Sequence, residues 1–311
     1  NNSFRFLIDG SETMSGSGLD SSFTVSAALT TTNGGTMTFK TAGSLAVALD
    51  ASSPAYAIAA GGQTNTSTSV LKFTATNEDI VLDQVALQLT NTASSSAGTI
   101  TRVTLWDGAT KVGESIFTSG ATTTLVNLSS TVNVPKDDDK SLTVKFDAAD
   151  IGTSKPGTQG DLNAIDWDGN NQAGNTTGVG QSSGTSITAT GSDTAAAGTR
   201  TFNTYPVVEK LALPSNTLSN GSEVQLLRFK ITANGADEVG LFEFNVTAAT
   251  TGVNVSNVNI HAYTDAGFTS PVSGTSADGQ LDNADKDFTT EGSTVEISVE
   301  NSSGTATPLQ V

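Results

Sequence analysis

The sequence predicts an all-β protein made of tandem immunoglobulin-like β-sandwiches, and three kinds of observation support this fold class. Apolar and polar residues alternate with a period of two in many short segments, as in strands with one buried and one solvated face. Gly, Ser, Thr and Asn separate these segments as turn signals, and long helical faces rich in Leu, Glu and Lys are absent. The third observation is an internal duplication.

The duplicated stretch is one alternating segment followed by a second one. Residues 71–77 read Leu-Lys-Phe-Thr-Ala-Thr-Asn, and the alternating segment 85–89 follows them. Residues 227–233 read Leu-Arg-Phe-Lys-Ile-Thr-Ala, and 242–246 follow in the same way. Because the spacing between the copies is nearly constant, we interpret the chain as carrying a duplicated β-domain.

Residues 1–43 are predicted to be a partial β-domain or a donor-strand segment. Alternation predicts strands at 4–8, 23–27 and 36–41, with Ser- and Gly-rich residues between them. A segment of this length cannot bury a useful core by itself, because short chains bury too small a share of their surface.

Residues 44–205 are predicted to form a complete immunoglobulin-like sandwich. Regular turn punctuation separates many short apolar segments, which is the signature of such a domain. Residues 150–184 are polar and Gly-rich, so they are expected to form an excursion loop outside the core. The strands are expected at 45–49, 69–76, 84–90, 100–106, 111–117, 124–128, 131–134 and 142–146.

Residues 206–311 repeat the pattern and are predicted to form a sandwich that lacks its last strands. Leu211 aligns with Leu45, and residues 308–311 align with 132–134. The counterpart of the strand at 142–146 does not follow. The other strands of this copy are expected at 226–232, 241–247 and 255–263.

A counterpart of the missing strand lies near the other end of the sequence. Residues 3–9, Ser-Phe-Arg-Phe-Leu-Ile-Asp, align with residues 141–147, Ser-Leu-Thr-Val-Lys-Phe-Asp. Further on, Val25 aligns with Ile187 and Phe39 with Phe202. Residues 1–43 therefore resemble the tail of a domain whose beginning is 206–311.

Three explanations of this arrangement are open. The head of one subunit completes the last domain of the next by strand donation, since a sandwich with an exposed edge and core groove is costly to leave bare. Alternatively, the chain is an excised part of a longer tandem array. In the third explanation, the two ends meet within one molecule. The first two make the protein a component of a linear array.

Strand donation assigns roles to particular apolar residues. Phe4, Phe6 and Ile8 share one face of the first predicted strand and are the expected donor anchors. The expected receiving groove is lined by residues of the second copy, namely Leu227, Phe229, Ile231, Phe242, Phe244 and Ile260.

Composition limits the partners. The chain has 31 acidic and 14 basic residues, a formal net charge of −17, and no basic cluster, which argues against nucleic acid as a partner. Cysteine is absent, so disulfides and thiolate metal sites are excluded. No apolar run approaches the ~20 residues that span a bilayer, so membrane insertion is not expected.

Two acidic stretches are candidate calcium sites, because calcium prefers closely spaced carboxylate and amide oxygens. In the first, Asp166, Asp168 and Asn170 lie on a Gly-containing segment, and Asp161 could join them. The second stretch offers the carboxylates of Asp278, Asp282, Asp285 and Asp287. The competing interpretation of both is a solvated acidic turn, because Asp, Asn and Gly are ordinary turn residues. Calcium is the only cofactor expected.

No catalytic constellation stands out, and the protein is not expected to be an enzyme. The single histidine, His261, lies in an alternating segment with no paired nucleophile. The rival to an assembly role is a binding module, an adhesin or carbohydrate-binding protein that stacks glycans on Trp106, Trp167 or Tyr263.

The strand motifs resemble a known group of proteins. Units that open near Leu45 and Pro54, continue through Leu-x-Phe-x-x-Thr at 71–76, and end a strand with Leu105-Trp106-Asp107-Gly108 are similar to immunoglobulin-like repeats of bacterial cell-surface proteins, of surface-layer or extracellular-fibre type. This resemblance implies export, stacked sandwiches and often calcium dependence. The expected function is therefore a secreted, extracellular structural subunit at the cell surface. It would self-assemble with copies of itself into a filament or surface layer (S-layer), and glycans are further candidate partners.

Overall fold

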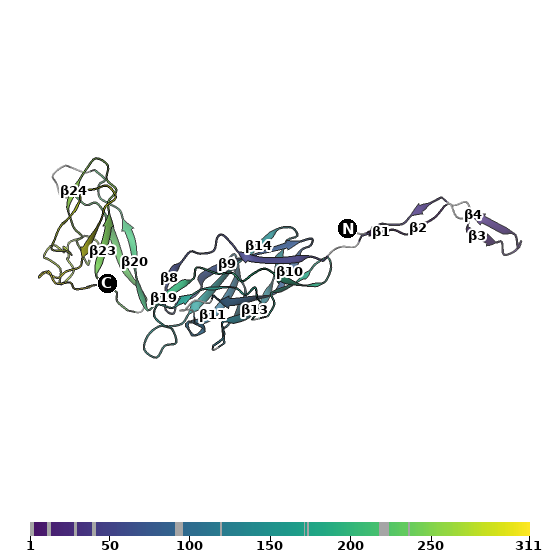
Figure 1. Ribbon diagram of the computed structural model, residues 1–311, viewed down its shortest axis with the longest axis horizontal. Coiled ribbons are helices and arrows are strands. Elements are labelled where there is room, and N and C mark those ends of the chain that lie inside the picture. Colours follow the sequence, from purple (N-terminus) through teal and green to yellow (C-terminus); the bar gives the residue numbers. More distant parts are fainter. Residues whose placement is uncertain are drawn as a thin grey trace. The chain divides into compact units, whose positions relative to one another are not determined.

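The protein is all-β in the computed structural model, which confirms the all-β part of the predicted fold (Figure 1). The chain divides into two compact units: the first contains residues 1–57, 64–147 and 162–199, and the second contains 58–63, 148–161 and 200–311. The structure describes residues 3–10, 14–27, 30–38, 42–90, 96–118, 120–170, 172, 174–217, 224–235 and 237–311.

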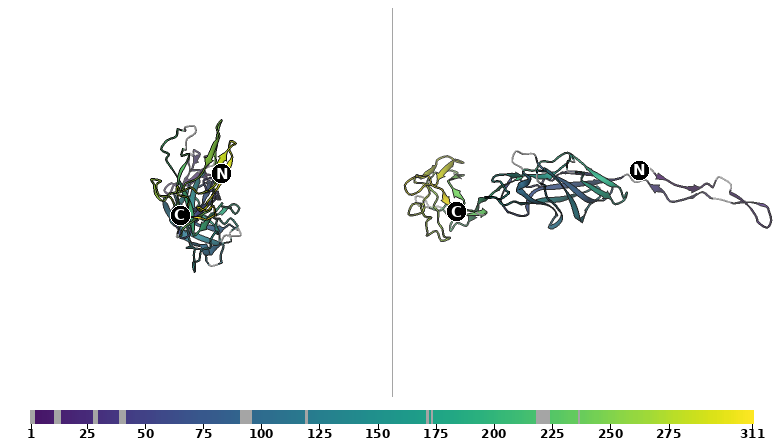
Figure 2. Two further views of the ribbon diagram at one scale, coloured as in Figure 1. Left: turned by 90° about the vertical axis from the view of Figure 1, so that its left-hand side faces the viewer. Right: turned by 90° about the horizontal axis from the view of Figure 1, so that it is seen from below.

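The first unit begins with a long antiparallel hairpin. Figures 1 and 2 show it as a narrow, extended ribbon. Strand β1 pairs with β6, β2 with β5, and β3 with β4, so the described pairs form one ladder that runs towards a tip at residues 18–23. The strands are β1 (Ser3–Phe4), β2 (Leu7–Ile8), β3 (Met14–Ser17), β4 (Thr24–Ala27), β5 (Thr32–Asn33) and β6 (Met37–Thr38).

The rest of the first unit is a barrel-like closed sheet. The strand order is β13-β12-β11-β14-β9-β7-β18-β17-β10-β16, and a pairing between β13 and β10 closes 9 of the strands into a ring. A short 3-10 helix, Ala97–Thr99, precedes β11. The strands are β7 (Ser44–Leu49), β9 (Thr66–Thr76), β10 (Ile80–Leu89), β11 (Ile100–Asp107), β12 (Thr110–Ser115), β13 (Thr123–Val134), β14 (Asp139–Ala148), β16 (Ile165–Trp167), β17 (Thr177–Gly180) and β18 (Ser186–Thr190).

The alternation seen in the sequence fills the barrel. On β9, Leu71 and Phe73 are fully buried, whereas Lys72 between them is partly exposed. Strand β14 pairs antiparallel with β9 and buries Leu142 directly opposite Leu71. The apolar face of each strand therefore points into the barrel, as the period of two predicts.

The prediction of an excursion loop at 150–184 is wrong for the later part of that stretch. Strand β16 pairs with β10, and its Ile165 and Trp167 are fully buried. Strand β17 is a member of the closed sheet. The polar composition is misleading because buried Asp166 receives hydrogen bonds from Gln88 and Ala196, which compensate for its burial.

The second unit is assembled from separate strand pairs. Antiparallel pairs join β20 to β21, β22 to β27, β23 to β26 and β24 to β25, while β8 and β19 are neighbours in a small sheet. Its buried apolar side chains include Leu281, Phe288, Ile297 and Val299. The remaining strands of the chain are β8 (Ala57–Ala60), β15 (Leu162–Asn163), β19 (Thr199–Phe202), β20 (Thr204–Leu211), β21 (Arg228–Gly235), β22 (Gly240–Leu241), β23 (Glu243–Thr247), β24 (Val255–Val258), β25 (Lys286–Phe288), β26 (Thr294–Ser298) and β27 (Leu309–Gln310).

The ladders correct one alignment between the copies. Val47 lies opposite Phe73 in the first unit, and Lys210 lies opposite the corresponding Phe229 in the second. Val208, rather than Leu211, therefore corresponds to Leu45. The sequence alignment slipped by a few residues because short apolar strands match in more than one register.

Candidate assembly site

The second unit leaves strand edges uncovered where the first unit covers them. Strand β21 pairs with β20 along its length, and no further strand joins either of them among the described residues. In the first unit the counterpart of β21 is β9, which pairs with both β7 and β14. The counterpart of β20 is β7, which also pairs with β18. Backbone groups along such edges can accept another strand.

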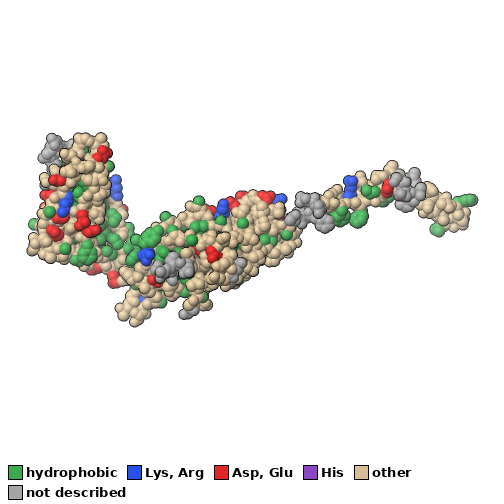
Figure 3. Space-filling view, in the orientation of Figure 1, with side chains coloured by type: hydrophobic (Ala, Val, Ile, Leu, Met, Phe, Trp, Pro, Cys, Tyr) green, Lys and Arg blue, Asp and Glu red, His purple; other side chains and the backbone are tan. Residues whose placement is uncertain are grey.

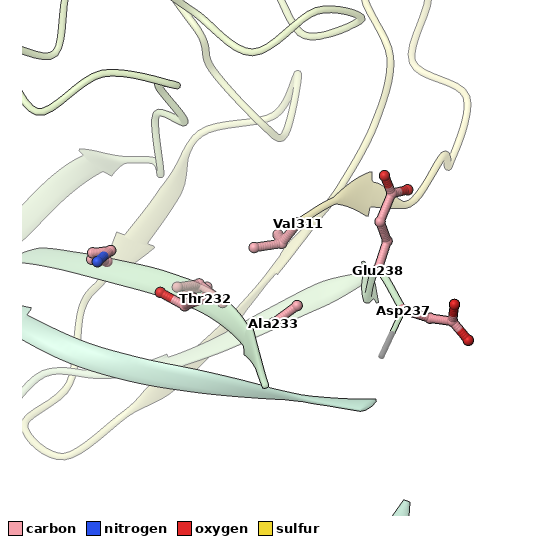
Figure 4. Close-up of a pocket in the computed structure, with 7 residues that line it drawn as sticks. Thr232, Ala233, Asp237, Glu238 and Val311 are labelled. Carbon is pink, nitrogen blue, oxygen red and sulfur yellow. The ribbon is translucent and has the colours of Figure 1, made fainter. Parts of the chain in front are cut away.

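A groove runs beside β21. Its volume is about 910 Å³, and Figure 4 shows consecutive residues of β21 on one wall, Val311 on the opposite wall, and Asp237 and Glu238 at one end. The sequence predicted only Ile231 among these groove residues; it missed the others because most of them are polar and follow no periodic pattern. The lining residues are Lys230, Ile231, Thr232, Ala233, Asp237, Glu238 and Val311.

The predicted acceptor residues are less buried than their counterparts in the first unit. Leu227 is 52% exposed and Phe242 is 64% exposed, while their counterparts Leu71 and Val85 are both at 0%. The structure brings two of the acceptor residues together, since the rings of Phe229 and Phe244 lie 5.9 Å apart. The half-buried members of the set are Phe229, Ile231, Phe244 and Ile260. The second unit thus has an apolar face that its own described strands cover only in part.

The predicted donor residues are exposed on the hairpin. Phe6 is 81% exposed and Ile8 is 53% exposed, and the ring of Phe4 meets that of Phe6 edge-on at 5.7 Å. Figure 3 shows hydrophobic side chains on the surface of this ribbon. Other large apolar side chains of the hairpin are exposed as well, namely Leu7, Leu19, Phe23, Val25 and Met37. A two-stranded hairpin without a packed layer is marginally stable in water.

The first calcium candidate contains buried carboxylates that accept protein hydrogen bonds. Asp166 is fully buried; its Oδ1 accepts from Gln88 Nε2 at 3.0 Å, and its Oδ2 accepts from Ala196 N at 2.7 Å and from Thr90. Burial raises the pKa of Asp166. Asp168 is also fully buried.

The other two members of that candidate, Asn170 and Asp161, have different environments from Asp166. Asn170 is exposed and donates from its backbone and side-chain nitrogens to Asp193, at 2.7 Å in both cases. Asp161 belongs to the second unit, where burial raises its pKa against the opposing effect of Arg200.

The carboxylates of the second calcium candidate each have their own protein donors. Buried Asp282 accepts from Ala284 N at 2.8 Å, Lys286 Nζ at 2.9 Å and Ser298 N at 3.1 Å. Its burial opposes ionisation, but these hydrogen bonds outweigh the burial and lower the pKa of Asp282. The exposed partners in this candidate also accept hydrogen bonds, Asp285 from Asn259 and Gln280, and Asp287 from Asn257.

No group of three or more Asp, Glu or His side chains in the described part of the chain is arranged to hold a metal ion. Calcium binding at these stretches stays a prediction.

The aromatic residues considered for glycan stacking are engaged with other side chains. Trp167 is fully buried, and its indole nitrogen donates to Thr176 Oγ1 at 2.9 Å. Lys145 Nζ lies 4.3 Å from the centre of the Trp106 ring. Tyr263 packs edge-on against Phe268 at 5.7 Å. Trp167 therefore cannot serve as a stacking platform in this fold, and one face of Trp106 is occupied.

Within the described residues, no helix has the length and apolar character needed to cross a membrane.

Comparisons with known proteins identify no relative of this chain. No protein-family model matches the chain, and no curated protein or solved structure matches it either.

Proposed function

We propose that this chain is a structural subunit of a secreted surface filament or surface layer, whose copies join through inter-subunit β-strand complementation. The observation that carries the proposal is a correspondence inside the chain. The strand edges that no described strand covers in the second unit are those that β14 and β18 cover in the first unit. Residues 3–9 and 23–27 have the sequence character of those two strands.

The register of the first unit specifies how the donor strand would pair. Leu142 lies opposite Leu71, so Phe4 of one copy would lie opposite Leu227 of the next. Phe6 and Ile8 would take the places of Val144 and Phe146, both fully buried in the first unit. In this arrangement the second unit becomes a completed immunoglobulin-like sandwich, the finer form of the predicted fold.

The energetics favour this exchange. Burying the side chains of Phe4, Phe6 and Ile8 contributes about 5–8 kcal/mol before the costs of ordering and association. The hairpin gives up little in return, because β1 and β2 each pair over only 2 residues in the free chain.

An extracellular, cell-surface location is part of the proposal. The strongly acidic composition and the resemblance to repeats of bacterial surface proteins both support it. A linear array is expected because the donor and acceptor surfaces differ, and such heterologous contacts propagate from copy to copy unless the rotation between copies closes a ring.

Replacing the donor anchors tests the proposal. In the double variant Phe6→Ser with Ile8→Ser, sedimentation velocity should show loss of the oligomers formed by the unmodified chain. The stability of the first unit should stay within about 0.5 kcal/mol, because both side chains are exposed in the free chain. The matched control is Arg5→Ser with Leu7→Ser, which alters the opposite face of the same segment and should still assemble.

Undiminished oligomers in the Phe6/Ile8 variant would contradict strand complementation. A monomeric unmodified chain whose tryptophan fluorescence shifts on adding glycans would instead favour the carbohydrate-binding alternative.

A further inference from the structure

We infer that the tip of the N-terminal hairpin, β3 and β4, docks as a preformed unit onto the second unit of another copy, in the position that β17 and β18 hold in the first unit. The inference rests on the proposed strand complementation and extends it. The second copy would receive a strand at β21 and, in addition, a ready-made hairpin between the outer edges of β20 and β22.

The tip has the same strand register as the β17–β18 pair. Gly16 lies opposite Val25, just as Gly178 lies opposite Ile187. The flanking pairs agree too, since Ser17 faces Thr24 and Val179 faces Ser186. This match extends the alignment of Val25 with Ile187 to the whole two-stranded tip.

The two turns share their hydrogen bonds. Gly18 N donates to Phe23 O at 3.0 Å, and Ser22 N donates to Gly18 O at 2.8 Å. In the first unit, Gly180 N donates to Thr185 O at 3.0 Å, and Gly184 N donates to Gly180 O at 2.8 Å.

The backbone agrees at the same point of the turn. Ser22 has a φ of 56°, and its counterpart Gly184 has a φ of 67°. A non-glycine residue in this left-handed region is uncommon. The tip therefore keeps the conformation of an integrated hairpin although its apolar side chains are exposed.

Gly16 is the residue that points most directly to docking. A Cβ at Gly178 would lie 2.7 Å from Ile80 Cγ2 and 2.7 Å from the Val81 carbonyl oxygen, so close packing on β10 requires glycine there. A Cβ at Gly16 would meet nothing within 4 Å. The free hairpin thus gives no packing reason for a glycine at this position, whereas a hairpin docked like β17–β18 does.

The acceptor contacts follow from the first unit. Strand β17 pairs with β10, with Val179 opposite Val81, and this places Ser17 of the donor opposite Glu238 in the groove of the next copy. Strand β18 runs parallel to β7, with Ala189 beside Leu45, and this places β4 beside Val208. In this register Ala27 corresponds to Ala189 and would lie beside Val208, with Val25 two residues earlier on β4. Val208 is 63% exposed and Val25 is 58% exposed, so docking would remove apolar surface from water on both copies.

The side chains available to fill the core of the second unit are consistent with a donor that has no counterpart of β16. In the first unit, Leu87 lies opposite Trp167 of β16, which fills the barrel interior. Residues 9–13, which separate β2 from β3 in the sequence, are too few to supply a counterpart of β16 together with the segments that flank it. At the corresponding acceptor position the second unit has Phe244 in place of Leu87, a larger side chain that is half-buried with its ring 5.9 Å from that of Phe229.

Engineered cysteine pairs test the two contacts separately, because the chain has no cysteine of its own. Ser3→Cys with Arg228→Cys reports the donor strand on β21, and Ser17→Cys with Glu238→Cys reports the docked tip. Residues directly opposite on paired strands are within reach of a disulfide. Both variants should give ladders of disulfide-linked multimers on non-reducing gels. The out-of-register controls Ser3→Cys with Thr232→Cys and Ser17→Cys with Asn245→Cys should not.

The outcomes separate the inference from the function on which it rests. A ladder from the first pair with none from the second would overturn tip docking and leave strand complementation standing. Absence of both ladders would overturn both. A ladder from the tip pair alone would support the docked hairpin and contradict the pairing at β21.

A glycine substitution gives an independent readout. Gly16→Val should leave the thermal unfolding of the first unit unchanged and raise the concentration needed for half-assembly about tenfold or more. The matched control Ser15→Val, at the position of half-exposed Thr177, should assemble normally. Equal assembly of both variants would overturn the inference.

Discussion

Glu78 shows how one carboxylate joins distant segments of the first unit. Its side-chain oxygens accept from Gly43 N, Ser182 N, Ser183 N and Ser183 Oγ, each at 2.7 Å. The hydrogen bond from the Ser183 hydroxyl is the main cause that lowers the pKa of Glu78 from 4.5 to about 2, followed by the bond from Gly43. The ionised form is therefore the one that the fold holds.

The stability of the first unit should depend on pH through Glu78. Because its pKa is lower in the folded than in the unfolded chain, its contribution is complete above about pH 5 and is lost as pH falls towards 2. Urea unfolding followed by tryptophan fluorescence measures this unit alone, since both tryptophans, Trp106 and Trp167, belong to it. In Glu78→Gln the decline over this pH range should be shallower; an identical decline would contradict the assigned role.

Replacing Gly178 should lower the stability of the first unit, whereas replacing its counterpart in the hairpin, Gly16, should not. Gly178→Val should destabilise the first unit by about 1–3 kcal/mol, because the new side chain would overlap Ile80 and the backbone of β10. Urea unfolding of this variant beside Gly16→Val makes the comparison. Equal stabilities of the Gly178→Val and Gly16→Val variants would contradict the close packing of β17 on β10.

Among the secondary-structure elements of the first unit, β16 is the hardest to predict from the sequence. It is short, lies within a polar stretch, and alternates buried Ile165 and Trp167 around an equally buried Asp166. Longer strands were predictable because five or more alternating residues, as in β9 and β14, define a face. A strand of 3 residues has no period to detect.

Removing the aromatic centre of β16 should be costly. Trp167→Ala should destabilise the first unit by about 3–5 kcal/mol, since a large, fully buried side chain would leave a cavity. Trp106 remains as a tryptophan of the first unit, so its fluorescence still reports the unfolding midpoint of that unit in urea. A loss below about 1 kcal/mol would mean that the barrel interior rearranges to fill the space.

The candidate site was predictable in part for the same physical reason. Phe4, Phe6 and Ile8 were identifiable as one apolar face, and Leu227 and Phe242 as residues that face could pack against. The alternation of apolar and polar residues in a strand can be read from the sequence alone. In the tip, β4 lies within the strand predicted at 23–27, but β3 was not predicted because Met14-Ser15-Gly16-Ser17 has no apolar alternation. The similarity of the tip to the β17–β18 pair lies in its hydrogen bonds and strand register, which the sequence does not show.

At the scale of the whole molecule, the chain pairs a closed barrel with a second copy of the pattern that has uncovered edges. The first unit supplies an internal template for closure, since β14, β17 and β18 each pair where the second unit has an edge without a neighbour among the described strands. Exposed apolar strands of this kind associate with complementary edges. Self-assembly by strand complementation is therefore the account that uses both surfaces.

Competition by a synthetic peptide of residues 1–30 tests that account most directly. Added in increasing amounts to the unmodified chain, the peptide should occupy the edges of β20 and β21 and convert oligomers into peptide-capped monomers in sedimentation velocity. A scrambled peptide of the same composition should leave the oligomers intact. Oligomers that persist at saturating peptide, or an unmodified chain that stays monomeric at every concentration, would contradict assembly through this site.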